Sequence, residues 1–173
     1  MDVMHSAHNF GRAAARIQIR VLTSDDWETL RDIRLRALAD AAEAFGTKLV
    51  EAQALSEQQW RSRVTGRAQF IAISAGYPVG MVAAGPDPDG DGVYLSSMWV
   101  IRSYRGRGVS DQLIHAVVEW ALGQGHRVIR LEVTEGNHHA ERLYTRHGFA
   151  RTGRTKPMAD DDPRIEFEMT LII

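Results

Sequence analysis

A glycine-rich turn between a strand-like and a helix-like segment constrains this chain more than any other feature. Residues 93–100 form an apolar run typical of a strand, and residues 110–125 repeat apolar side chains at helical spacing. Between them stands Arg105-Gly-Arg-Gly-Val-Ser110. Glycines let backbone N–H groups converge on one point, and a helix that begins there adds partial positive charge. The turn predicts an anion site suited to a pyrophosphate, or else a helix cap without a ligand.

Other phosphate-binding loops fit this turn less well. A P-loop requires Gly-Lys followed by Ser or Thr, and the sequence contains no such triplet. A Rossmann turn requires a third glycine three residues after Gly108, where this chain has Asp111. Arg102, Arg105 and Arg107 add positive charge around the turn.

The order of the expected elements predicts a mixed α/β (α+β) layer with helices on both faces. A capping box of Ser56 and Gln59 begins one helix, and Ser24 or Asp25 begins the one before it. Gly46 leads from that earlier helix into a segment without an assigned element. Strands are expected at 17–22, 69–75, 79–85, 93–100, 127–133, 149–154 and 164–172, and helices at 24–39, 56–66, 110–125 and 138–148.

A second segment, from Leu131 to Phe149, turns from a strand into a short helix. Asn137 stands where the helix begins and predicts an N-cap. Ala140 and Tyr144 fall on one helical face. Taken alone, this tyrosine would be assigned to the core.

Together the two segments resemble the GNAT superfamily of acyl-CoA-dependent N-acyltransferases. Arg105–Ser110 matches the family's Arg/Gln-x-x-Gly-x-Gly/Ala loop, with Ser110 where Gly or Ala is usual. The later Asn-x-x-Ala-x-x-x-Tyr-x-x-x-Gly-Phe signature matches Asn137, Ala140, Tyr144, Gly148 and Phe149. The resemblance covers about residues 17–172, but the first third matches only in outline.

The resemblance implies a mixed sheet of about seven strands that splays between the fourth and the fifth. Acetyl-CoA would wedge between residues 93–100 and 127–133 as the acyl donor. The expected cofactor contacts are the main chain of Met98, Trp99 and Val100, the amides of Arg105, Gly106, Arg107, Gly108, Val109 and Ser110, and the side chains of Asn137 and Tyr144.

The resemblance also implies direct attack of a neutral amine on the thioester, with Tyr144 as the acid for the departing thiolate. The spacing from Glu132 to Tyr144 is similar to the branch that acetylates the N-termini of ribosomal proteins, in which the matching Glu is the base. We expect burial to raise the pKa of Glu132. Two alternatives stay open: Glu132 pairs with Arg130 or Arg142 as a structural contact, or Ser96 or Ser97 orders a water chain.

Composition limits the remaining function classes. The chain has 173 residues, 21 basic and 22 acidic side chains and a net charge of −1, which predicts one domain over 16–173 and no nucleic-acid or membrane partner. Residues 1–15 are polar and aperiodic and are expected to be a flexible tail. The absence of cysteine fits a reducing cytoplasm. No metal site is expected, and Asp87–Gly92 is interpreted as a solvated turn rather than a calcium loop.

The expected activity is acetyl-CoA-dependent acetylation of a primary amine on a small molecule. A protein N-terminal or lysine acetyltransferase is the alternative in the same class, and a non-catalytic acyl-CoA sensor is the alternative in another class. Trp27, Phe45 and Ser97 are expected to line the acceptor channel, although core packing also explains the aromatic pair. A homodimer is possible, as in many members of the family.

Overall fold

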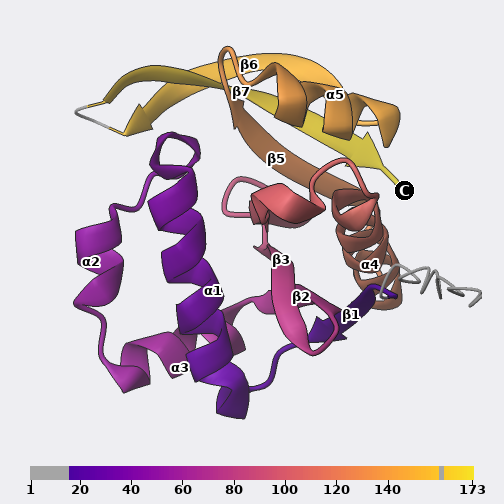
Figure 1. The fold of residues 1–173 in the computed structure, drawn as a ribbon. Helices are drawn as coiled ribbons and strands as arrows, with labels where there is room; N and C mark the ends of the chain where they lie inside the picture. Colours follow the sequence, from indigo (N-terminus) through magenta and orange to yellow (C-terminus); the bar gives the residue numbers. More distant parts are fainter. Residues whose placement is uncertain (1–15, 160–161) are drawn as a thin grey trace, which may run out of the picture.

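A single mixed β-sheet runs through the molecule, with helices on both of its faces (Figure 1). The computed structural model describes residues 16–159 and 162–173. The predicted N-terminal tail therefore lies outside the described residues. The strands are β1 Gln18–Val21, β2 Ala68–Ser74, β3 Tyr77–Pro86, β4 Val93–Val100, β5 Val128–Thr134, β6 Ala150–Ala159 and β7 Asp162–Ile172.

Five α-helices and three short 3₁₀ turns accompany the strands of the described chain. Ser56 caps α3 by accepting from the amide of Gln59, whose side chain accepts in return from the amide of Ser56, as the sequence predicts. The helices are α1 Trp27–Asp40, α2 Leu49–Gln53, α3 Glu57–Gly66, α4 Val109–Gly123 and α5 His138–Arg146, and the 3₁₀ turns are η1 Ser24–Asp26, η2 Ala42–Ala44 and η3 Arg102–Tyr104.

The sheet has the strand order β1-β2-β3-β4-β5-β7-β6, and β4–β5 is its parallel pair. These two strands pair only through Val93 with Ile129 and Tyr94 with Arg130. In contrast, β5 pairs with β7 along its whole length. The fourth and fifth strands therefore splay apart, and the predicted fold class is confirmed.

A β-bulge lies in β4 just beyond its last pair with β5. Two steps along β3, from Met81 to Ala83, face three steps along β4, from Trp99 to Ser96. Ser97 has φ of +60° inside this bulge. A residue other than glycine held in this region costs about 1–3 kcal/mol, and a bulge bends its strand. The bend thus accompanies the separation of β4 from β5.

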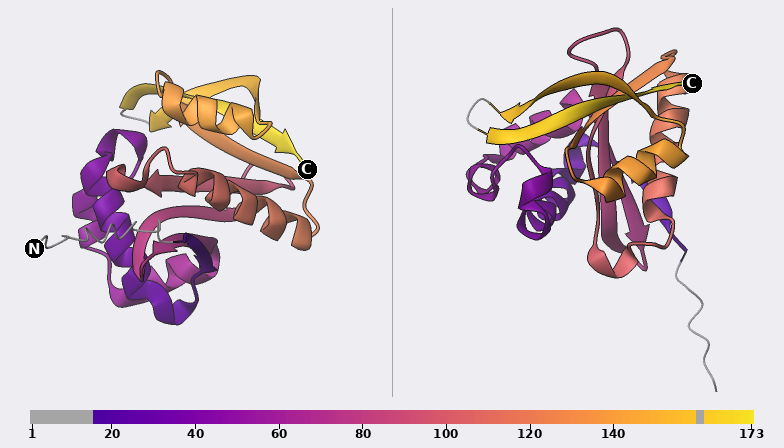
Figure 2. Two further views of the ribbon diagram at one scale, coloured as in Figure 1. Left: turned by 45° about the vertical axis from the view of Figure 1, so that its right-hand side comes forward. Right: turned by 90° about the horizontal axis from the view of Figure 1, so that it is seen from above.

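Two apolar cores cover the two faces of the sheet, since neighbouring residues of a strand point to opposite faces. Ile33 of α1 and Trp60 of α3 pack with Met81 of β3 in one core. Leu113 of α4 packs with Val82 of β3 in the other, which also contains residues of α5. Figure 2 shows α1–α3 on one side of the sheet and α4 and α5 on the other. Within the described residues, no helix has both the length and the apolar character that a membrane crossing requires.

The structure differs from the predicted elements in three places. Residues 24–26 form the 3₁₀ turn η1, and α1 begins only at Trp27 with Asp26 as its N-cap, so neither Ser24 nor Asp25 caps the helix as predicted. The unassigned segment after Gly46 contains α2, which is short and mostly exposed and so has little apolar periodicity. The final hairpin is longer than expected, because β6 and β7 pair as far as Ala159 with Asp162. Polar residues and Pro157 hide this extension in the sequence, since an exposed hairpin needs main-chain hydrogen bonds but no apolar pattern.

Replacing Leu113 with Ala tests the core between α4 and the sheet. Leu113 is fully buried, so the variant loses apolar contacts and leaves a cavity. We expect the free energy of unfolding in urea to fall by about 2–5 kcal/mol. Leu122→Ala on the same helix is the control, because Leu122 is 42% exposed, and equal losses in both variants would contradict this packing.

Candidate active site

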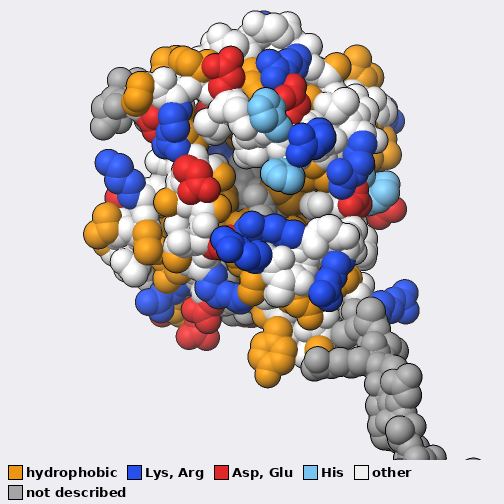
Figure 3. Space-filling model, turned by 45° about the horizontal axis from the view of Figure 1, so that its top comes forward, with side chains coloured by type: hydrophobic (Ala, Val, Ile, Leu, Met, Phe, Trp, Pro, Cys, Tyr) orange, Lys and Arg blue, Asp and Glu red, His pale blue; other side chains and the backbone are white. Residues whose placement is uncertain are grey.

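A cavity of about 220 Å³ lies where β4 and β5 separate. A hollow is also visible on the face that contains this opening, with Lys or Arg side chains below it and His side chains beside it (Figure 3). The lining comes from four regions of the chain: Arg34 and Ala44–Gly46, then Tyr94–Met98 of β4, then Glu132–Thr134 of β5 with Asn137, Ala140, Leu143 and Tyr144, and finally Met158 and Glu166 of the last hairpin.

Among the described residues, no strand pairs with the edge of β4 that faces this opening beyond Tyr94. On its other edge β4 pairs with β3 as far as Val100. Unpaired N–H and C=O groups on such an edge can bind an extended, amide-rich ligand. The contacts predicted at Met98–Val100 use the main chain, which agrees with the structure. The side chain of Trp99 is buried in the core beside α1 and donates from Nε1 to Asp40 at 3.0 Å.

The glycine-rich turn ends in a helix without a side-chain cap. Gly106 and Gly108 have φ of +71° and +75°, and Gly108 is the N-cap of α4. A Cβ at either glycine would meet no atom within 4 Å, so the turn opens to solvent. The first N–H groups of α4 thus keep their donors for an anion. This geometry fits the predicted pyrophosphate site.

The side chain of Arg105 has a different partner from the expected phosphate. Its Nε donates to the carbonyl of Val100 at 2.8 Å, and its guanidinium pairs with Asp40 at the end of α1. Hydrogen bonding from Trp99 and the charge of Arg105 hold the pKa of Asp40 below its usual value, against the effect of burial. Arg105 therefore ties the turn to α1. Its backbone amide donates to the carbonyl of Arg102 at 3.3 Å, so the amides that remain for a ligand are those that follow it in the turn.

Two predicted residues of α5 line the cavity together. The Asn137 side chain accepts from the amide of Ala140 at 3.2 Å, which confirms the N-cap. Tyr144 is 6% exposed and packs edge-on against Phe149 with 5.5 Å between ring centroids. Burial raises the pKa of Tyr144, so its hydroxyl keeps its proton at neutral pH. The hydroxyl is a proton donor at the cavity wall.

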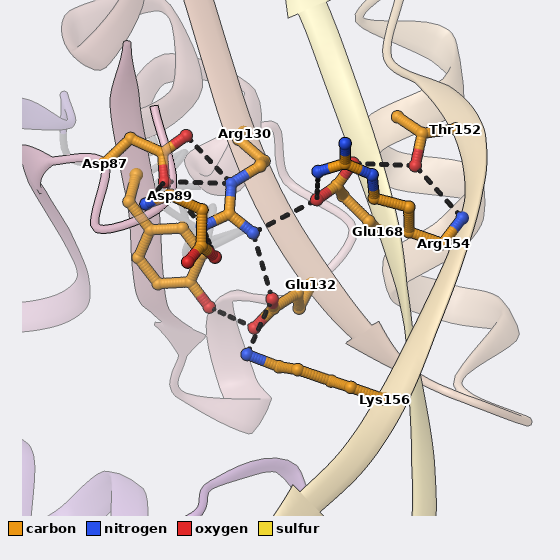
Figure 4. A network of polar contacts seen from close by, with 9 residues as sticks. Asp87, Asp89, Arg130, Glu132, Thr152, Arg154, Lys156 and Glu168 are labelled. Carbon is orange, nitrogen blue, oxygen red and sulfur yellow. Dashed lines mark hydrogen bonds and ion pairs between the residues drawn. The ribbon is translucent and has the colours of Figure 1, made fainter. Parts of the chain in front are cut away.

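Glu132 lines the same cavity but is held as an anion (Figure 4). It accepts from Tyr94 Oη at 2.7 Å and from Arg130 at 3.1 Å, and Lys156 Nζ lies 2.8 Å away. Burial by itself would raise the pKa of Glu132. The hydrogen bonds from Lys156 and Tyr94, together with the positive charges of Lys156 and Arg130, outweigh burial, so the pKa of Glu132 lies below its usual value. The expectation of a raised pKa is therefore wrong, and the pairing with Arg130 is present.

Glu166 of β7 also lines the cavity, and sequence reasoning missed it. Its pKa is raised by burial and by the charge of Glu132. The two carboxylates thus have pKa values moved in opposite directions, an arrangement that separates acid–base roles. No motif marks Glu166, because its proximity to Glu132 depends on the pairing of β7 with β5.

Arg130 organises the buried charges behind the cavity (Figure 4). Its guanidinium contacts Asp87 and Asp89 of the β3–β4 loop, Glu132 of β5 and Glu168 of β7. Asp87 was expected in a solvated turn, but its side chain is only 6% exposed, because the ion pair with Arg130 draws it inward. Within the described part of the chain, no group of three or more His, Asp or Glu side chains is placed to hold a metal ion.

Only two of the three residues predicted to line the acceptor channel lie at the cavity. Phe45 and Ser97 line the cavity, whereas Trp27 lines neither this cavity nor its neighbour in the described chain. Trp27 begins α1, where its ring lies 5.6 Å from the guanidinium of Arg61. The residue of α1 that lines the cavity is Arg34. It stands one helical turn after Leu30 and one turn before Leu38, so the sequence spacing places it on the buried face of the helix.

A family model described as the Acetyltransferase (GNAT) family matches residues 27–149. This match covers most of the chain, so the chain belongs to the GNAT family of acetyltransferases. It is similar to N-acetylaspartate synthetase of Danio rerio, with 34% identity over 92 residues that make up 53% of this chain and 33% of that protein. It is also similar to aminoglycoside N(6')-acetyltransferase type 1 of Salmonella typhimurium, with 31% identity over 94 residues that make up 50% of this chain and 65% of that protein.

Both relatives are thus matched over less than two thirds of their own lengths. A solved acetyltransferase structure from Salmonella typhimurium, with its cofactor acetyl-CoA, has a TM-score of 0.72 at 18% identity, covering 91% of this chain and 94% of that chain. At this identity the likeness concerns the fold.

Replacing Arg130 with Met tests the buried network. Removing one cation leaves several carboxylates unpaired, so we expect a loss of about 3–5 kcal/mol in unfolding free energy at pH 7. Hydrogen bonds from Arg130 lower the pKa of Asp87 in the fold, so this stabilisation is present at neutral pH and is lost as the pH falls through the lowered pKa. The gap between variant and wild type, measured by urea unfolding, should therefore stay near its full size down to about pH 4 and narrow below it.

Arg127→Met is the matched control, because Arg127 is exposed and donates only to the backbone carbonyl of His126. An Arg130 variant with the same stability as this control at pH 7 would contradict the proposed importance of the network.

Proposed function

We propose that this protein is an acetyl-CoA-dependent N-acetyltransferase that transfers the acetyl group directly to a primary amine of a small molecule. The observation that carries the proposal is the opening between β4 and β5, which joins a free strand edge, an uncapped helix N-terminus and a buried tyrosine in one site. Family membership supports the same reaction class.

Acetyl-CoA would supply the activated thioester at this site. Of the predicted amides of Arg105–Ser110, those of Gly106–Ser110 would hold its pyrophosphate, because the helix start has no side-chain cap and the Arg105 amide already donates to the Arg102 carbonyl. The open edge of Met98–Val100 would pair with its amide-containing arm, and Asn137 would hold that arm from the opposite wall. Residues on both walls of the opening therefore position the donor.

The remaining groups of the cavity would handle protons. In the overall exchange the amine nitrogen gains a bond to the acetyl carbon and loses one proton, and the sulfur loses that carbon and gains one proton. Tyr144 keeps its proton at neutral pH and would give it to the sulfur. Glu166 has the higher proton affinity of the two carboxylates and would accept the proton of the amine, while Glu132 stays charged and raises the pKa of Glu166.

Both relatives, N-acetylaspartate synthetase and aminoglycoside N(6')-acetyltransferase, are named for small molecules, which supports a small-molecule acceptor over a protein. The sequence-based alternative, a protein N-terminal or lysine acetyltransferase, shares the donor site and differs only in the acceptor. A sensor without turnover would bind CoA and release no thiol with any amine. The cytoplasmic location and the homodimer stay predictions of the sequence.

Tyr144→Phe tests the acid. We expect kcat for thiol release from acetyl-CoA to fall by about 100-fold or more, because the leaving sulfur loses its proton donor. The Kd for CoA should stay unchanged, since the ring and its packing remain. Tyr77→Phe is the control, because Tyr77 is 74% exposed. A Tyr144 variant with full kcat across the pH range would contradict the role.

The pH dependence of kcat/KM in variants distinguishes Glu166 from Glu132 as the general base. Glu166 must lose its proton to act, so kcat/KM should fall as the pH drops through its raised pKa. Glu132→Gln removes the negative neighbour, so this limb of the profile should move to lower pH. Glu166→Gln should lower kcat and remove the limb. If Glu132→Gln removes the limb instead, the base is Glu132, as the sequence predicted.

A further inference from the structure

Arg34 is a partly buried cation beside the proposed point of acetyl transfer. It comes from α1, donates from Nη1 to Ser97 Oγ at 3.1 Å, and its guanidinium carbon lies 4.4 Å from the centre of the Phe45 ring. Burial, together with the charge of Arg63, lowers the pKa of Arg34 to about 10. Among the described residues no carboxylate forms an ion pair with it. The charged side chain that shifts the pKa of Arg34 is that of Arg63, which is also a cation.

A second cavity, of about 450 Å³, adjoins the first through Arg34, Ser96 and Ser97. Two further arginines line it, Arg63 of α3 and Arg67 of the turn into β2, and the Arg67 guanidinium donates to Ser96 Oγ at 3.2 Å. The described lining contains no Asp or Glu. The remaining lining is apolar or neutral and includes Leu30, Trp60, Met81, Thr47, Ser62 and Gln69.

Three arginines around one cavity, one of them partly buried, favour an anion as the occupant. A buried charge is costly unless a partner of opposite sign compensates for it. A guanidinium offers parallel N–H donors that match the two oxygens of a carboxylate. Here Ser97 uses only one of the Arg34 donors among the described contacts, so donors remain for a ligand. The first cavity has the opposite character, because it contains Glu132 and Glu166.

We propose that the acceptor is an amine that also carries a carboxylate, such as an amino acid, with the carboxylate bound by Arg34. This inference rests on the proposed acetyltransferase function and names its substrate class. The amine would enter the first cavity, near Glu166 and Tyr144, and the carboxylate would stay at the wall that the two cavities share. Arg63 and Arg67 would attract the anion and bind any second acidic group. Polycationic acceptors such as polyamines are disfavoured at this wall by like-charge repulsion.

Matched acceptor pairs test the proposal directly. Thiol release from acetyl-CoA is measured with aspartate, glutamate, leucine and phenylalanine, each beside its α-carboxamide, and with spermidine and kanamycin. The carboxamide has the less basic amine and so more free nucleophile at pH 8, which favours the amide in the chemical step. We expect binding of the carboxylate to outweigh this effect, so that kcat/KM for each free amino acid is at least about tenfold higher than for its α-carboxamide.

Variants assign that preference to Arg34. Arg34→Gln should lower kcat/KM for the acids by about 10- to 100-fold and remove the acid-over-amide preference, with the KM for acetyl-CoA unchanged. Arg34→Lys should keep part of the preference. Arg63→Gln changes an exposed residue and should reduce the preference without loss of stability. Arg31→Gln, an exposed position on the same helix, is the charge-matched control and should behave as wild type.

The outcomes separate the two proposals. Carboxamides or polyamines turned over as well as the acids would overturn the carboxylate site and leave the acetyltransferase in place. No thiol release with any amine would overturn the acetyltransferase. In that case calorimetric titration of the same amino acids into wild type and Arg34→Gln decides the anion site: binding lost in the variant supports it, and equal or absent binding overturns it.

Discussion

The short pairing between β4 and β5 is the constraint on which the rest of the structure depends. Two residue pairs, Val93–Ile129 and Tyr94–Arg130, join the halves of the sheet, and beyond them the strands part. Backbone groups on an interior strand need hydrogen-bond partners, so the parting leaves an edge that a ligand can complete. The bulge at Ser97 bends β4 at this point, and α5 places Tyr144 against the opposite wall. The cavity, the open strand edge and the position proposed for the acid all depend on this one interruption of the β-ladder.

Arg130 stabilises the root of this separation. Its backbone belongs to one of the two pairs, and its guanidinium connects the β3–β4 loop with β5 and β7 (Figure 4). The same contacts set the electrostatics of the cavity. Positive charge from Arg130 and Lys156 keeps Glu132 ionised, and the ionised Glu132 raises the pKa of Glu166. The network around Arg130 thus holds the β3–β4 loop in place and also, through Glu132, raises the pKa of Glu166 on β7.

The site also divides its electrostatic character by position. Backbone donors lie at the turn before α4, two carboxylates line the first cavity, and Arg34 lies where the first cavity adjoins the second, which we propose to be the donor side, the point of transfer and the acceptor side. Arg105, although it belongs to the loop motif, is neutralised by Asp40 and fixes the turn to α1. The arginines near the anion sites therefore differ in role: one positions the backbone, and another keeps donors for a ligand.

Residues that are neighbours along the chain were enough to predict the strand at 93–100, the glycine-rich turn, the helix at 110–125 and the caps at Ser56 and Asn137. The splayed sheet was an implication of the family resemblance. The partners of the charged groups at the site became visible only in the folded structure. Arg34 meets Ser97, Glu166 approaches Glu132, and Asp87 is drawn to Arg130 across wide gaps in sequence. The pKa of a buried group depends on all of its neighbours in space, which strand pairing sets and local patterns do not record.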